Sequence, residues 1–123
     1  MLQENIVEKF QFKNKSFIQT EQDNILQIRE LLNSFYPSLK ISYVFEIDLN
    51  DGSLIFTVNK SDKKFKEIFN FSQLFIIFSY ELKTNTPAYC IQSNSNRKCF
   101  TEFKEMYQFL EGYFNDLVFL LDM

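Results

Sequence analysis

The spacing of apolar residues changes twice along this chain, and this change constrains the fold more than any other feature. Near both ends, in residues 21–35 and 101–121, apolar residues recur every three or four positions. Between them, from residue 41 to residue 58, they alternate with polar residues. Steps of three and four indicate amphipathic helices, whereas alternation indicates half-buried strands. The chain is therefore predicted to be an α+β protein.

The first helix is predicted over residues 21–35, with its start at Thr20 and Pro37 as its end. The Thr20 hydroxyl can cap a backbone N–H, and the acidic Asp23 follows three residues later, as in a capping box. The predicted buried stripe of this helix comprises Ile25, Ile28, Leu31, Leu32 and Phe35. Residues 2–17 fit either a short helix or an edge strand, and the sequence does not choose between them.

A β-hairpin is predicted over residues 41–59. Strands at 41–49 and 54–58 flank Asn50-Asp51-Gly52, residues that tolerate the positive φ angles of a tight turn. We expect Gly52 to adopt such an angle.

Two more strands are predicted after this hairpin. A short helix at about 61–69 comes first, followed by a strand at about 73–82 that is apolar on both faces and so belongs in the middle of the sheet. A strand of about five residues includes Tyr89 and Ile91, and residues 93–96 form a polar loop after it. The last helix, from about residue 101 to 121, should bury Phe103, Met106, Tyr107, Leu110, Phe114, Leu117 and Leu121.

These elements predict a single α+β domain over residues 1–123. Its core would be a roughly four-stranded antiparallel sheet, with the hairpin at 41–59, flanked on one face by an N-terminal and a long C-terminal amphipathic helix. The opposite face of the sheet is expected to be open.

The composition lacks or is poor in residue types on which many catalytic mechanisms depend. The chain has no His and only two Gly, so it lacks the usual general base and cannot form a Gly-rich phosphate loop. We predict no enzyme activity, no catalytic residues, no cofactor and no metal site. Without a signal peptide or a membrane-spanning run, a cytoplasmic location is predicted, in which Cys90 and Cys99 would be free, reduced thiols.

The charge balance indicates the kind of partner. The net charge of −3 argues against direct nucleic-acid binding, which needs a surplus of Lys and Arg. From residue 99 onward five acidic residues stand against Lys104 alone. A protein partner with a basic surface is therefore expected, with no membrane, and a homodimer is possible.

The last helix supplies the candidate binding surface. On a helical wheel several aromatic and acidic residues fall outside the predicted buried stripe, and aromatic anchors with a charged rim are typical of protein interfaces. The predicted partner-binding residues are Phe109, Phe119, Glu105, Asp116, Glu102 and Tyr113.

Three hypotheses of function follow. The first is a small acidic inhibitor or shield of the immunity-protein, antitoxin or phage-encoded anti-defence type, which docks on a protein partner. The second is a small-molecule or lipid-binding domain with a Phe-lined cavity. The third is a secretion-chaperone-like subunit, which rests on size, acidity and element order alone.

Overall fold

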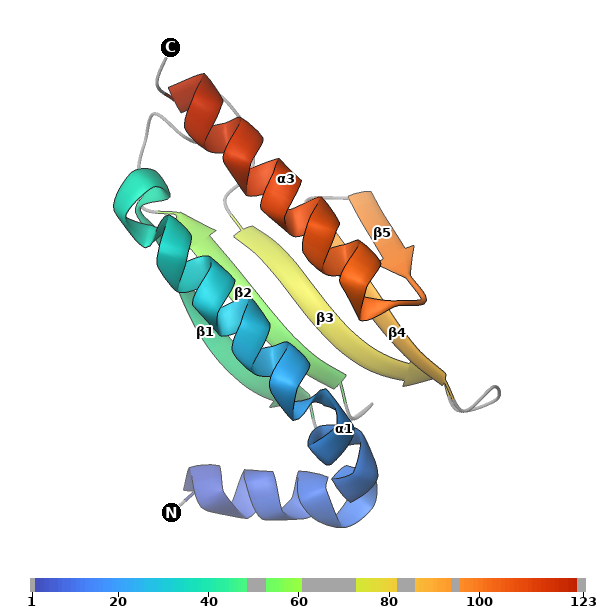
Figure 1. Cartoon of the computed structure of the whole chain (residues 1–123). Helices are drawn as coiled ribbons and strands as arrows, with labels where there is room; N and C mark the ends of the chain where they lie inside the picture. The colour runs from blue at the N-terminus through green and yellow to red at the C-terminus, as the bar shows by residue number, and fades with distance from the viewer. Residues whose placement is uncertain (1, 49–52, 61–72, 82–85, 94–95, 122–123) are drawn as a thin grey trace.

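The structure is a computed structural model of the 123-residue chain, and Figure 1 shows its arrangement. It describes residues 2–48, 53–60, 73–81, 86–93 and 96–121, with side chains for all of these except 2–20, 60, 80 and 81. The described elements, in chain order, are α1 (Leu2–Leu39), β1 (Ile41–Asp48), β2 (Ser53–Lys60), β3 (Gln73–Glu81), β4 (Thr86–Ser93), β5 (Asn96–Phe100) and α3 (Phe103–Leu121).

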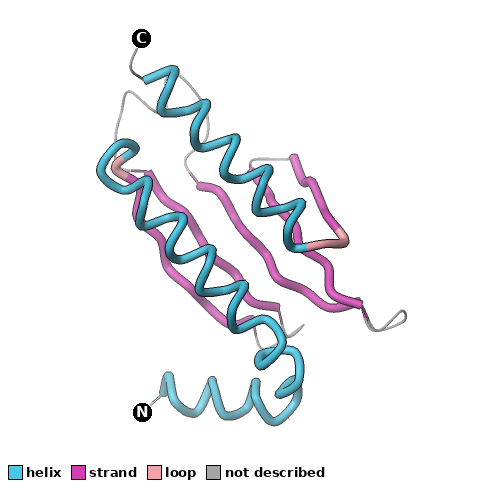
Figure 2. Tube along the Cα trace, in the orientation of Figure 1, coloured by secondary structure: helices cyan, strands magenta, loops and turns pink. Residues whose placement is uncertain are grey.

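The sheet is an antiparallel meander in which the strands lie in sequence order, from β1 at one edge to β5 at the other. Figures 1 and 2 show α1 and α3 side by side in one layer over the same face of this sheet. α1 lies over the β1 side and α3 over the β4 and β5 side. The α+β class predicted from the sequence is confirmed, with five strands in place of four.

The strand register explains which residues are buried. Phe45 lies opposite Phe56, Phe56 opposite Ile76, and Ile76 opposite Ile91, so one row of apolar side chains crosses four strands on the helix-covered face. Neighbouring residues in each strand point to the other face. The predicted hairpin strands and the central strand β3 are confirmed by this pairing, because β3 has a neighbour on each side.

The two helices meet each other as well as the sheet. The rings of Phe35 in α1 and Phe114 in α3 have centroids 5.3 Å apart. Phe56, Phe78 and Phe114 are the largest fully buried side chains, and most of the other buried residues are Leu and Ile, so a mixed aromatic and aliphatic core lies between the helix layer and the sheet.

The first helix is longer than predicted at both ends. It begins at Leu2, so Thr20 lies inside a helix and is not its cap, and the segment 2–17 is helical. Pro37 lies within the last turn, where its missing N–H removes only one helical hydrogen bond. The helix ends at Leu39, and Lys40 after it has a left-handed φ of 55° and donates its N–H to the Tyr36 carbonyl at 2.8 Å.

The prediction of a polar loop at 93–96 was wrong in part, because β5 begins at Asn96. This strand has five residues and carries Arg97 and Lys98, so its own sequence shows little apolar alternation. Its pairing with β4 stabilises it. The predicted turn at Gly52 and the predicted short helix at 61–69 lie outside the described residues.

The prediction of two free thiols was also wrong. Cys90 of β4 and Cys99 of β5 lie directly opposite each other, with Cα atoms 4.0 Å apart, and form a disulfide. The register of two adjacent strands brings them together, and that register could not be known without β5. The prediction of free thiols assumed a reducing compartment. Disulfides persist mainly in oxidising compartments, so the disulfide does not support that assumption.

Candidate functional site

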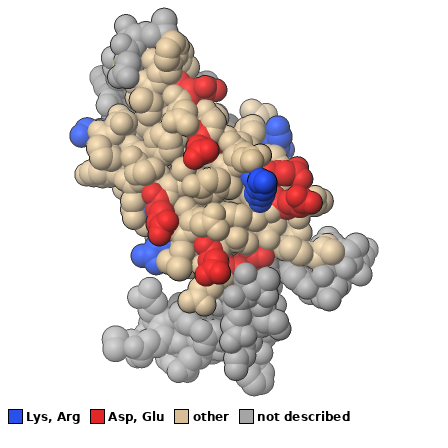
Figure 3. All heavy atoms as spheres, viewed as in Figure 1, with Lys and Arg blue, Asp and Glu red and all other residues tan. Residues whose placement is uncertain are grey.

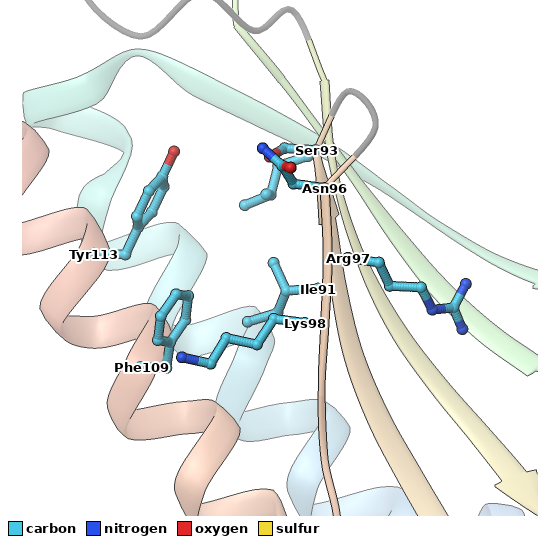
Figure 4. A pocket seen from close by; sticks show the side chains of 8 residues that line it. Ile91, Ser93, Asn96, Arg97, Lys98, Phe109 and Tyr113 are labelled. Atoms are coloured by element: carbon cyan, nitrogen blue, oxygen red, sulfur yellow. The ribbon is translucent and has the colours of Figure 1, made fainter.

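A half-open cavity of about 280 Å³ lies between α3 and the β4–β5 hairpin, and we call it the β5–α3 groove (Figure 4). Two cross-strand pairs provide its strand side. Lys98 lies opposite Ile91, and Asn96 lies opposite Ser93, so all four are on the helix-covered side of the sheet. The residues that line the groove are Leu74, Ile91, Ser93, Asn96, Arg97, Lys98, Phe109 and Tyr113.

Two aromatic rings form the helix side of the groove. Phe109 and Tyr113 are one helical turn apart, and their rings stack with centroids 6.3 Å apart and planes 12° from parallel. The Phe109 ring also lies 5.6 Å from the Phe100 ring of β5. Phe109 is nevertheless 36% exposed, so part of this ring is available at the mouth of the groove.

Lys98 and Arg97 are neighbours in sequence but point to opposite sides of β5. The Lys98 Nζ lies 4.5 Å from the centroid of the Phe109 ring, a cation–π contact in which the two side chains point toward each other (Figure 4). The Arg97 side chain points away from the groove, and its Nη1 donates to Gln92 Oε1 at 3.2 Å. The groove therefore contains one cation, held against an aromatic face.

The Tyr113 hydroxyl is neutral in this site. Burial raises the pKa of Tyr113 to about 12, because the phenolate would lose hydration. At physiological pH the helix side of the groove presents aromatic surface and a protonated hydroxyl, without a charge of its own.

Acidic residues lie on either side of the two rings along α3. Glu105 is one turn before Phe109 and Asp116 is one turn after Tyr113, so all four share one flank of the helix. Glu102 precedes α3 and is three residues from Glu105. The three acidic side chains are exposed. Figure 3 shows carboxylates spread over the helix-covered face, with Lys and Arg side chains beside some of them.

Phe119 does not belong to the groove. It lies ten residues after Phe109, so the two directions around the helix axis differ by roughly 80°. Its side chain is 68% exposed. Of the six predicted residues, the structure brings Phe109 and Tyr113 together in the groove, places Glu102, Glu105 and Asp116 on its flank, and leaves Phe119 on the outward face of α3.

Sequence reasoning missed the strand side of the groove. Lys98 and Phe100 are two residues apart and both face the helix layer, so their alternation after the polar sequence Ser93-Asn94-Ser95 was an available signal. Two cysteines nine residues apart were a second signal, since their pairing requires a short hairpin.

A second polar cluster lies between α1 and β4. Glu21 of α1 is only 1% exposed, and its Oε1 accepts a 2.6 Å hydrogen bond from the Tyr89 hydroxyl of β4. Its Oε2 accepts a 2.8 Å bond from Asn24 Nδ2. Burial, followed by the bond to Glu21 and its charge, raises the pKa of Tyr89 well above its usual value. The cluster ties α1 to the sheet.

Within the described residues, no group of three or more His, Cys, Asp and Glu side chains is placed to hold a metal ion. A search of the described helices finds none with the length and apolarity needed to cross a membrane. Comparison of the chain with protein-family models, with curated proteins and with solved structures finds no match. The geometry of the groove is therefore the basis for any statement about function.

Proposed function

We propose that this protein is a non-catalytic binding module that docks on a protein partner and inhibits or shields it. The β5–α3 groove receives an apolar side chain of the partner, and the flank of α3 contacts basic residues around it. The observation that carries this proposal is the stacked pair Phe109–Tyr113 at the groove, between Glu105 and Asp116 on the same flank.

The size of the groove favours a side chain over a small molecule. Pockets for drug-sized ligands enclose about 300–1,000 Å³ and cover most of the ligand. The β5–α3 groove, at about 280 Å³, is smaller and half open. It is large enough for one or two apolar side chains presented by a protein surface, and a partly exposed aromatic ring beside it is a typical interface anchor.

The charges favour a basic partner. Glu102, Glu105 and Asp116 are exposed, whereas the cation of the groove, Lys98, lies over the Phe109 ring. Acidic residues around an apolar anchor speed the encounter with a basic surface and suppress binding of acidic ones.

The test begins with affinity capture from the native host, using the wild-type protein, Phe109→Ala and Leu26→Ala as parallel baits. Leu26 is an exposed apolar residue on α1, away from the groove, and is therefore the matched control. A partner captured by the wild type and by Leu26→Ala should be lost with Phe109→Ala. Calorimetry with the purified partner should show affinity lower by about 30-fold or more, the scale of an interface hot spot.

Charge reversal supplies a second measurement on the same complex. Glu105→Lys combined with Asp116→Lys should slow association, and the difference from the wild type should shrink as salt is added. Equal affinity for the wild type and folded Phe109→Ala would contradict the proposal. A hydrophobic small molecule retained in native mass spectrometry, and lost with Phe109→Ala, would favour the ligand-binding hypothesis in its place.

A further inference from the structure

The β1 edge of the sheet is open to backbone pairing. β1 pairs with β2 on one side, and no other strand among the described residues pairs with it. Its eight residues contain neither Pro nor Lys, and its pairing with β2 continues through all eight without a bulge. Proteins usually protect an exposed edge with short strands, Lys, Pro or bulges. The opposite edge follows that rule, because β5 has five residues and carries Arg97 and Lys98.

The side chains of β1 leave apolar surface at the centre of this edge. Val44 points to the sheet face without helices and is 50% exposed. Tyr43 and Phe45 point to the helix layer, where both contact the Phe56 ring, but neither is fully buried. A second strand beside β1 would cover all three.

We propose that β1 pairs antiparallel with β1 of a second copy of this chain, about a two-fold axis at Val44. In this register the numbers of two facing residues add up to 88. Both residues of such a pair point to the same face of the sheet. Tyr43 then faces Phe45, an aromatic cross-strand pair that stabilises antiparallel sheets. The other pairs are Val44 with Val44, Ile41 with Ile47 and Ser42 with Glu46.

The strand is complementary to itself in this register. Apolar residues face apolar residues, and the Ser42 hydroxyl can donate to the Glu46 carboxylate. A shift of two residues in one direction places Val44 against Glu46, and a shift in the other places it against Ser42. The first shift pairs as many residues as the Val44 register but places an apolar side chain against a carboxylate, and the second pairs only residues 41–45, so the register centred on Val44 is favoured.

The resulting dimer is a closed, two-fold assembly, the commonest kind of homo-oligomer. Its two sheets form one continuous sheet with all four described helices on one face. The β5–α3 grooves lie at the two far edges, because β5 is at the opposite edge from β1. Dimerisation and partner docking therefore use separate surfaces, and each can fail without the other.

Sedimentation velocity over a concentration series tests the proposal with the full chain. The wild type should shift from 14.8 kDa toward twice that mass as concentration rises. Val44→Lys places two ammonium groups at the axis and should weaken the dimer at least tenfold (about 1.4 kcal/mol). Leu26→Lys, which adds the same charge at a residue 45% exposed on α1, should dimerise like the wild type.

Two further sets of variants test the register. Ser42→Glu, which faces Glu46, should weaken the dimer, whereas Ser42→Lys should strengthen it. Val44→Cys should form a covalent dimer on mild oxidation. Glu46→Cys should not, because its two copies would lie four residues apart along the strands, about 13 Å.

A wild type that remains monomeric at every concentration would overturn the proposal. So would a dimer that withstands both Val44→Lys and Ser42→Glu, each shown to be folded by its thermal melt. A dimer sensitive to Val44→Lys but cross-linked through Glu46→Cys would overturn the register.

Discussion

The hydrogen bond between Tyr89 and Glu21 allows a quantitative test of how α1 is held to the sheet. The Glu21 carboxyl is almost completely buried, and its two oxygens accept hydrogen bonds from Tyr89 and Asn24. Tyr89→Phe removes the 2.6 Å bond without changing the ring, which packs edge-on against Phe78 and Phe103. A hydrogen bond to a charged group contributes about 1.5–3 kcal/mol, so we expect the free energy of unfolding to fall by about 2 kcal/mol.

A double-mutant cycle separates the contribution of the Glu21 charge from that of the hydrogen bond between Glu21 and Tyr89. Glu21→Gln keeps a carbonyl oxygen that can accept the tyrosine hydroxyl, and it removes the buried charge. In that background Tyr89→Phe breaks a bond between neutral groups and should cost about 1 kcal/mol. The coupling between the two positions is therefore about 1 kcal/mol.

Guanidinium unfolding at neutral pH, followed by circular dichroism, measures all four proteins of the cycle. Tyr36→Phe is the matched control, because Tyr36 is exposed on α1 and its substitution should change stability by less than about 0.5 kcal/mol. Two results would contradict a charged acceptor at Glu21. One is a loss of unfolding free energy from Tyr89→Phe that is no larger than that of the control. The other is an equal loss from Tyr89→Phe in the wild type and in Glu21→Gln.

Three further predictions concern the disulfide, one glycine and alkaline pH. Reduction of Cys90–Cys99, which closes a loop of about ten residues, should lower the free energy of unfolding by about 2–3 kcal/mol, and a melt that is the same with and without reductant would contradict this. Gly112→Ala should raise stability by about 0.5–1 kcal/mol in the same unfolding assay, because a Cβ at this mid-helix position meets no atom within 4 Å; a loss of stability would show that the helix needs a glycine there. The raised pKa of Tyr113 gives a contribution to stability that is complete below pH 10 and is lost as pH rises toward about 12, with a slope of up to about 1.4 kcal/mol per pH unit. Urea unfolding of the wild type and Tyr113→Phe from pH 9 to 11 should show the shallower decline in the variant, and parallel curves would refute the assignment.

The parts of the fold that the sequence predicted are those with a local cause. The stripe of α3 and the alternation of β1 and β2 follow from residues close together in the chain, and the apolar run at 74–78 marks a strand with neighbours on both sides. Phe109 and Tyr113 could be assigned to one flank because helix geometry alone fixes their relative direction.

The parts that the sequence did not predict depend on pairing between elements. β5 is too short and too polar to be recognised alone, and it exists as the partner of β4. The Cys90–Cys99 disulfide and the contact of Lys98 with Phe109 both follow from that pairing, so missing β5 meant missing both. The length of α1 is a different case, because Thr20 and Pro37 are good boundary signals that helical neighbours override.

The order of elements in this meander has a consequence for synthesis on the ribosome. Each strand pairs with the one made just before it, so the sheet can form while the chain is still growing. α3 follows all five strands, yet it covers the β4 and β5 side of the sheet and its Phe114 packs against Phe35 of α1. Until α3 leaves the ribosomal exit tunnel, no helix covers the apolar side chains of Leu74, Ile76 and Ile91. The nascent chain therefore passes through an interval in which chaperones, proteases and other growing chains can reach its core.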